Sequence, residues 1–169
     1  MDQGEDMVRC LVLPIVGEQI LLPNAMVAEV YAADGVSAST GGPDWLLGRV
    51  IWRGIELPLV CMEAALGGPR LEAGARSKVV VIKTLSASEA LRNFAVLVQG
   101  IPHQILAADH SVAVRAPING ARPFVALDLQ VEDEQAFIPD MDAIERALLD
   151  AVDYWRARDS DDGDGDEFS

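Results

Sequence analysis

The most informative segment of this chain is WLLGRVIWRGIELPLVC, which runs from Trp45 to Cys61. Two runs in it alternate as half-buried strands do, and the pair Arg53-Gly54 lies between them. A two-residue turn at this pair predicts a β-hairpin whose bulky apolar side chains share one side of the ribbon. The expected cross-strand pairs are Trp52 with Ile55, Val50 with Leu57 and Gly48 with Leu59.

The same hairpin predicts an exposed charge and an unusual strand residue. We expect the guanidinium of Arg53 at a solvent-exposed tip. Pro58 has no N–H to donate, so it fits the second strand only on a sheet edge or at a bulge. A ribbon with a charged tip and an edge proline describes a docking surface better than a catalytic pocket.

Length and charge restrict the class of protein. A chain of 169 residues, half of them apolar, can bury a sizeable core and predicts one compact domain or two small fused barrels. Its 13 basic and 27 acidic residues give a net charge of -14. Such a charge repels phosphate backbones and anionic lipid surfaces, so nucleic acid is not an expected partner.

Location and redox state follow from the apolar runs and the cysteines. No run approaches the roughly 20 apolar residues of a membrane span, and the opening MDQGEDM is acidic where a secretory signal is basic. We therefore expect a cytoplasmic protein without direct membrane insertion. Cys10 and Cys61 are far apart and lack Cys-x-x-Cys spacing, which predicts reduced, buried thiols that act as small apolar side chains.

The remaining strands are predicted from short β-branched or alternating runs. Their spacing of roughly 8 to 12 residues is typical of small barrels or a sandwich. Outside the hairpin these runs lie at 8–16, 19–23, 27–31, 78–85, 94–98, 104–107, 112–114 and 124–131. Together with the two hairpin strands they make ten, and a connector containing Gly and Pro at 63–77 divides them into two five-stranded units.

A C-terminal helix is predicted at 140–156, with Asp140 as its cap. Its apolar residues fall at helical spacing and form one stripe, which we assign to the core: Met141, Ile144, Leu148, Val152 and Trp155. The run 159–169 is acidic with two glycines and is predicted to be a disordered tail after a domain at 1–158. Its alternating Asp162, Asp164 and Asp166 lack the glycine and the glutamate of a calcium loop.

Residues that could carry catalysis are few. His103 and His110 cannot form a metal site by their spacing, and we interpret both as ordinary surface or core histidines. No nucleophile elbow, phosphate-binding glycine loop or Ser/His/Asp order is present. The sequence therefore predicts a non-enzymatic protein without cofactor or metal. The alternative is a small-molecule-binding or enzymatic β-barrel protein with a pocket between its two units.

The hairpin and the segment before it resemble a known family, the CheW-like chemotaxis coupling proteins. The resemblance rests on Leu46-Leu47-Gly48-Arg49-Val50-Ile51-Trp52-Arg53-Gly54 followed by Pro58-Leu59-Val60, and on Leu21 to Val30 upstream. Order and spacing match over roughly residues 8 to 156. The resemblance implies an all-β fold with a C-terminal helix, made of two five-stranded SH3-like barrels at roughly 14–66 and 76–139, with the helix at 140–156.

The resemblance also implies partners and contact residues. Such adaptors couple the cytoplasmic tip of a methyl-accepting chemoreceptor to the regulatory domain of a CheA-type histidine kinase, at receptor arrays on the inner face of the membrane. It assigns Val27, Glu29, Arg53 and Gly54 to the receptor contact, with Glu29 and Arg53 as a charge pair. It assigns Leu46, Leu47, Gly48 and Pro58 to the kinase contact.

Three departures from the family pattern favour a divergent adaptor. Ile51 and Trp52 stand where the family has asparagine and leucine, and Cys61-Met62-Glu63 replaces the Asp-Leu-Arg that usually follows the proline. With its acidity, the chain is most similar to the accessory CheW-like proteins, the ChpC type, of type IV pilus and twitching-motility chemosensory systems.

Overall fold

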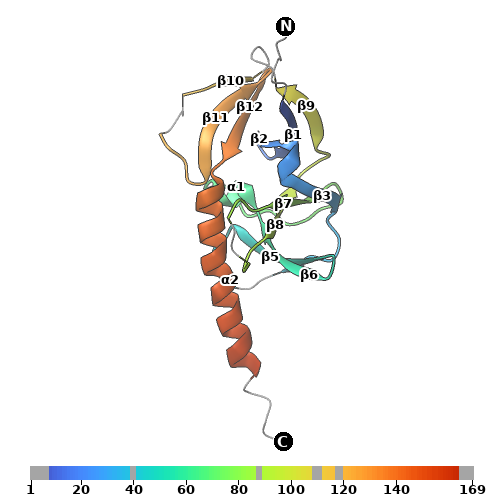
Figure 1. Cartoon of the computed structure of the whole chain (residues 1–169), viewed down its shortest axis with the longest axis vertical. Helices are drawn as coiled ribbons and strands as arrows, with labels where there is room; N and C mark the ends of the chain where they lie inside the picture. The colour runs from blue at the N-terminus through green and yellow to red at the C-terminus, as the bar shows by residue number, and fades with distance from the viewer. Residues whose placement is uncertain (1–7, 39–40, 87–88, 108–111, 117–119, 164–169) are drawn as a thin grey trace, which may run out of the picture.

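The computed structural model describes residues 8–38, 41–86, 89–107, 112–116 and 120–163. In these residues the chain forms strands and three helical segments, and β-structure dominates (Figure 1). The strands are β1 (Val8–Ile15), β2 (Glu18–Pro23), β3 (Val27–Ala32), β4 (Ser37–Ala38), β5 (Leu46–Trp52), β6 (Ile55–Val60), β7 (Lys78–Lys83), β8 (Asn93–Val98), β9 (His103–Ala107), β10 (Val112–Val114), β11 (Val125–Val131) and β12 (Glu134–Pro139). The helices are the 3-10 turn η1 (Asn24–Met26), α1 (Met62–Ala65) and α2 (Met141–Gly163).

Two sheets stack along the long axis of the molecule, and α2 runs down beside the lower one (Figure 1). One sheet, here the upper sheet, has the order β10-β11-β12-β2-β1-β9, and the lower sheet has the order β3-β7-β8-β6-β5-β4. Each contains one parallel pair, β12 with β2 above and β6 with β8 below. The predicted class, all-β with a C-terminal helix, is confirmed, although each sheet has six strands and not five.

The two sheets do not correspond to the two predicted units. The upper sheet combines β1 and β2 with β9 to β12, whereas the lower sheet is built from β3 to β8. The limits 14–66 and 76–139 therefore cut across both sheets. Apolar alternation indicates where a strand lies but not which strand pairs with it, and here β1 takes β9 as its second neighbour over a long separation in sequence.

Two strands escape prediction from the sequence. β4 has two exposed residues in a Gly-rich loop. β12 follows β11 through a turn at Glu132 and Asp133, and Glu132 adopts a positive φ of 54° without being glycine. Hairpin turns normally use Asn or Gly at such positions, so the acidic turn gives no sequence signal for a hairpin, and β12 was not predicted.

The predicted β5–β6 hairpin is confirmed in every expected pair. Trp52 lies opposite Ile55, Val50 opposite Leu57 and Gly48 opposite Leu59. Both turn residues have positive φ, 51° at Arg53 and 76° at Gly54, as a type I′ turn requires. The edge assignment of Pro58 is wrong because β6 lies between β5 and β8. Its ladder to β8 covers only Leu59 and Val60, so the missing N–H of Pro58 interrupts no bond on that side.

Three apolar clusters hold the sheets and α2 together. Each sheet has a core of its own, and a larger central core joins both sheets to α2. Neighbouring residues of β7 show the division, since Val80 faces the central core while Val79 and Val81 face the core of the lower sheet. The continuous apolar run of β7 is therefore a strand buried on both faces.

Helix α2 begins where the sequence predicts and ends later. The Asp140 carboxylate accepts a bond of 3.1 Å from the Ala143 N–H, which confirms the cap. The predicted stripe is core, with Ala151 buried in addition and Val152 only partly buried. The helix continues to Gly163, so residues 159–163 of the predicted disordered tail are helical, and residues 164–169 lie outside the described chain. Among the described residues no helix is long and apolar enough to cross a bilayer.

The two cysteines are free and buried, as predicted. Cys10 belongs to the core of the upper sheet and Cys61 to that of the lower sheet. Burial raises the pKa of both thiols, which keeps them protonated and unreactive. His103 is exposed on β9, and His110 lies outside the described residues.

Candidate functional site

The lower sheet brings two distant segments together at the hairpin tip. β3 is an edge strand and β5–β6 lies on the opposite side of the sheet order, yet Glu29 of β3 meets the β5–β6 turn. The indole Nε1–H of Trp52 donates to Glu29 Oε2 at 3.3 Å, and Arg53 Nη2 lies 3.6 Å from Glu29 Oε1. The sheet must curl to close this contact. We call Glu29, Trp52 and Arg53 the tip cluster.

The tip cluster is exposed and weakly held. The side chains of Arg53 and Glu29 are 69% and 43% exposed, so their attraction is screened and is worth about 0 to 1 kcal/mol. The Arg53 guanidinium carbon lies 4.7 Å from the centre of the Trp52 ring, in cation–π geometry. The resemblance predicts the Glu29–Arg53 pair, and the structure brings these two residues together. Trp52, which joins them, was not among the predicted site residues.

Two residues border this cluster in different ways. Gly54 completes the exposed turn beside Arg53. Val27 lies earlier on β3, but its side chain is partly buried against the central core, so it supports the strand more than it extends the surface. Tyr31, also on β3, has a buried hydroxyl without a hydrogen-bond partner among the described residues. Burial and, secondly, the Glu29 carboxylate raise the pKa of Tyr31.

The four residues assigned to a kinase contact lie inside the fold. Leu46 and Leu47 are 1% and 5% exposed and face the central and lower cores respectively. Gly48 and Pro58 are buried as well. A bulge between Leu46 and Gly48 shifts the alternation of β5, which lets Leu47 and Val50 face the same core. Side chains in these positions orient the hairpin and do not form an open surface, so their contact with a kinase stays a prediction.

Arg70 holds the start of β5 and was not identified from the sequence. Its guanidinium donates to the backbone carbonyls of Asp44, Leu46 and Leu47 at 3.1, 3.1 and 3.3 Å. These bonds tie the connector after α1 to the first strand of the hairpin. An arginine in a Gly- and Pro-rich connector gives no sequence signal for such a role.

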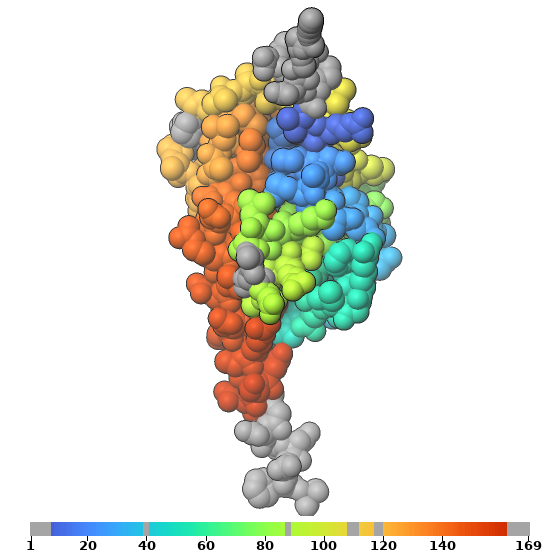
Figure 2. All heavy atoms as spheres, viewed as in Figure 1, coloured from blue at the N-terminus to red at the C-terminus, as the bar shows by residue number. Residues whose placement is uncertain are grey.

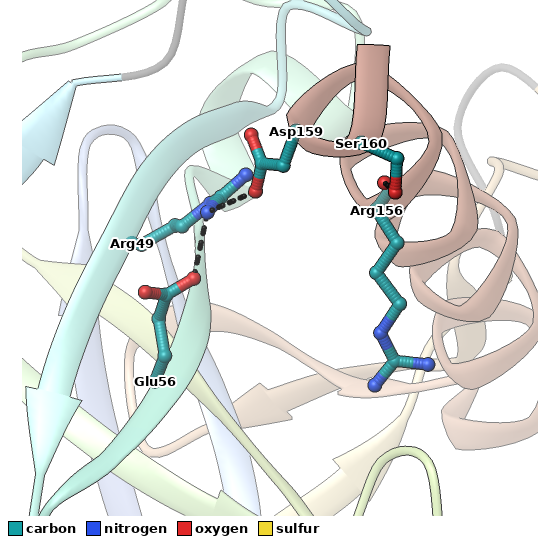
Figure 3. Close-up of polar contacts among 5 residues, drawn as sticks. All are labelled: Arg49, Glu56, Arg156, Asp159 and Ser160. Atoms are coloured by element: carbon teal, nitrogen blue, oxygen red, sulfur yellow. Dashed lines mark hydrogen bonds and ion pairs between the residues drawn. The ribbon is translucent and has the colours of Figure 1, made fainter. Parts of the chain in front are cut away.

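A second polar cluster lies where the end of α2 crosses the hairpin (Figure 3). Arg49 Nη1 contacts Glu56 Oε1 at 2.8 Å and Asp159 Oδ2 at 3.1 Å, and its guanidinium carbon lies 4.4 Å from the centre of the Trp155 ring. Trp155 is only 7% exposed. Arg49, Glu56, Trp155 and Asp159 form what we call the helix seam, beside a cleft of about 160 Å³.

The helix seam covers strand residues that the sequence places on a docking surface. Pro58 and Leu57 line the same cleft as Trp155 and Asp159. In Figure 3 the neighbouring Arg156 extends away from Arg49, and Ser160 Oγ donates to the Arg156 carbonyl at 2.9 Å within the helix. The last turn of α2 projects past the body of the molecule (Figure 2). In the sequence, the contact between the end of α2 and the hairpin is indicated only by the position of Trp155 on the apolar stripe of the helix.

A third charged group, in the upper sheet, stabilises the fold. Arg122 donates to both carboxylate oxygens of Glu18, at 2.7 and 3.0 Å, and to Asp128 at 2.5 Å. The hydrogen bond to Glu18 is the main cause that raises the pKa of Arg122. The Arg122 guanidinium offsets one of the two partly buried carboxylate charges and links β2, β11 and the segment before β11, so we assign this group a structural role.

These features define a class: a two-sheet β domain with an exposed, charged hairpin tip that an edge strand closes. The model of the CheW-like domain family matches residues 9–148, and the chain belongs to this family. Among solved structures it is similar to the crystal structure of scaffolding protein TtCheW from Thermoanaerobacter tengcongensis, with a TM-score of 0.64 and 17% sequence identity over 79% of this chain and 89% of that chain. At this identity the likeness concerns the fold. A comparison with curated proteins found no significant match.

Proposed function

We propose that this protein is a non-enzymatic signal-transduction adaptor that couples a chemoreceptor to a CheA-type histidine kinase. The observation that carries the proposal is the tip cluster, in a chain that belongs to the CheW-like family. An exposed charge pair that adds little to folding is explained by recognition. We place the protein in the cytoplasm, at receptor arrays on the inner face of the membrane, and in a type IV pilus chemosensory system.

We propose that the receptor and the kinase contact different parts of the hairpin, its tip and its strands. We propose that Glu29 and Arg53 contact the receptor tip, with Gly54 shaping the turn and Val27 fixing β3. We propose that the kinase regulatory domain binds the hairpin strands, whose position is set by the four buried residues Leu46, Leu47, Gly48 and Pro58. Exposed Ile51 of β5 is 63% accessible and offers the apolar contact that such a site needs.

The alternative function, a protein with a ligand pocket between its two units, is not favoured by the cavity found at that place. The site where the two sheets meet α2 is lined by Trp45, Val60, Met62, Ala65, Phe124, Ile144 and Ala147 and holds about 10 Å³. That volume is at most that of one water molecule. A substrate pocket is normally about 300 to 1,000 Å³ and encloses its ligand.

The adaptor proposal predicts binding without cofactor. The purified protein should bind the regulatory domain of its CheA-type kinase with modest affinity, because transient signalling contacts bury less than about 1,200 Å². Isothermal calorimetry measures this, with Ile51→Asp as a surface variant and Val114→Asp, on the upper sheet and 69% exposed, as the matched control. The Ile51 variant should bind more weakly than the control. Absence of heat and of any complex at high protein concentration would contradict the proposal.

The receptor contact predicts a charge-swap result at the tip. Arg53→Glu and Glu29→Arg should each leave the melting temperature nearly unchanged, because their pair is exposed, and each should weaken binding of the receptor tip. The double swap should restore part of the affinity through a coupling energy. Circular dichroism checks the fold and surface plasmon resonance the affinity. Unfolding of Arg53→Glu, or normal receptor binding by both single variants, would contradict the receptor contact of Glu29 and Arg53. The two residues would then be an ordinary surface ion pair.

A further inference from the structure

Trp52 gives the tip cluster a chemistry that a charge pair alone lacks. Its indole N–H engages Glu29 at 3.3 Å while its ring lies under the Arg53 guanidinium at 4.7 Å. The distance from Arg53 Nη2 to Glu29 Oε1, 3.6 Å, is too long for a hydrogen bond. Glu29 is therefore hydrogen-bonded to the tryptophan and leaves the donors of Arg53 unused.

The free donors of Arg53 are the second observation. An arginine carries five N–H donors in one plane. Among the residues that the structure describes, Arg53 donates no hydrogen bond, and its only contacts of charge or ring type are those with Glu29 and Trp52. A guanidinium that stacks on an aromatic face keeps its edge open, so those donors point to solvent at a side chain that is 69% exposed.

The backbone at Arg53 is the third observation. Its φ of 51° lies in the left-handed region, which disfavours side chains with a Cβ. Asn, Asp or Gly would satisfy this turn position with less strain. A long cation at a strained, solvent-exposed turn position is therefore explained by its head group and not by the turn.

We propose that Trp52 and Arg53 form a platform that binds a carboxylate side chain of the partner. The planar guanidinium, held on the indole, donates two parallel N–H bonds to the two carboxylate oxygens of an Asp or Glu. Glu29, held by the indole N–H, presents its second oxygen to a basic neighbour of that carboxylate. The partner surface recognised is thus an acidic residue beside a basic one, and Glu29 discriminates against a purely acidic surface. This inference rests on the proposed receptor contact and names its chemistry.

The residue type at position 52 is decisive for this platform. A leucine, which the family pattern has here, offers neither a π face to Arg53 nor a donor to Glu29. Phenylalanine keeps the face and loses the donor. The two substitutions therefore separate stacking from hydrogen bonding, and Arg53→Lys removes the planar fork while leaving the apolar packing of position 52 intact.

Sodium acetate is a probe that tests the platform without any receptor. Acetate replaces chloride at constant ionic strength, and the Nε–H signal of Arg53 in the full-length protein is followed by NMR. Wild type should show saturable shifts. Trp52→Leu should weaken the acetate affinity by about two- to fivefold, as expected for loss of an exposed cation–π contact. Trp52→Phe should stay within about twofold of wild type, because its ring still supports the guanidinium.

Arg53→Lys should lose the saturable acetate response, followed at the Trp52 indole N–H, and it keeps the test decisive if Trp52→Leu does not fold. Equal acetate affinity in wild type and Trp52→Leu, or saturable binding in Arg53→Lys, would overturn the platform. A parallel titration with the receptor-tip fragment separates the two proposals. Failure of wild type to bind that fragment, with acetate behaving as expected, would refute the receptor assignment and leave the carboxylate platform standing.

Discussion

Replacing Gly48 with alanine should destabilise the protein by about 3 kcal/mol or more, the upper range for a side chain forced into a filled space. A Cβ at this position would lie 1.9 Å from the Ser37 carbonyl oxygen and 2.9 Å from its carbon. Those atoms belong to the backbone of β4, which pairs with β5 here, so no flexible side chain can move aside. Gly48 also has a φ of 153°, which alanine rarely adopts. Urea unfolding measures the change.

Gly54 offers the matched control on the same hairpin. A Cβ there meets nothing within 4 Å, and only its φ of 76° opposes alanine. Gly54→Ala should therefore cost about 1 kcal/mol. Similar losses for the two variants would mean that β4 does not press against Gly48. A folded, fully stable Gly48→Ala that failed only to bind kinase would move Gly48 from a packing role to a contact role.

Replacing Trp155 with alanine should lower the free energy of unfolding by about 3 to 5 kcal/mol, the range for removing a large buried aromatic side chain. Trp155 is 7% exposed, packs in the central core and supports the Arg49 guanidinium at 4.4 Å. Its loss opens a cavity and leaves Arg49, among the described residues, with its two exposed carboxylate partners Glu56 and Asp159. Guanidinium unfolding measures the stability, and hydrogen exchange of residues 152–160 measures the local opening.

The neighbouring Tyr154 is the control, since its side chain is 48% exposed on the same helix. Tyr154→Ala should change stability by less than about 1 kcal/mol, as surface substitutions usually do. If Trp155→Ala changed the free energy of unfolding as little as Tyr154→Ala, the end of α2 would not contribute to the stability of the core. Asp159→Ala, which removes only an exposed ion pair, should also be mild.

The hairpin and the helix could be predicted because their evidence is local. The alternation on both sides of Arg53-Gly54 and a turn that demands positive φ together fix the register of β5 and β6. In the same way Asp140 and an apolar residue at every third or fourth position fix the start and the inner face of α2. The burial of Cys10 and Cys61 follows from their apolar surroundings in sequence.

What escaped prediction depends on which segments meet in space. The division of strands between the sheets rests on β1 pairing with β9 and β2 with β12, which no local pattern encodes. The family resemblance assigns Leu46 and Leu47 to the kinase contact. In the structure a bulge in β5 orients Leu46 toward the central core and Leu47 toward the core of the lower sheet. Trp52 entered only as a departure from the family pattern, because its bond to Glu29 requires the curl of the lower sheet.

The end of α2 changes where this domain should be considered complete. The family match stops at residue 148, whereas the buried face of α2 continues through Ala151 to Trp155 and the helix reaches Gly163. A fragment trimmed to the family boundary would uncover the apolar wall formed by Leu57, Pro58 and Leu91. Uncovered apolar walls of this kind drive self-association. The segment that matches the family is therefore shorter than the segment that covers the apolar core. The difference is the last part of α2, which Trp155 anchors.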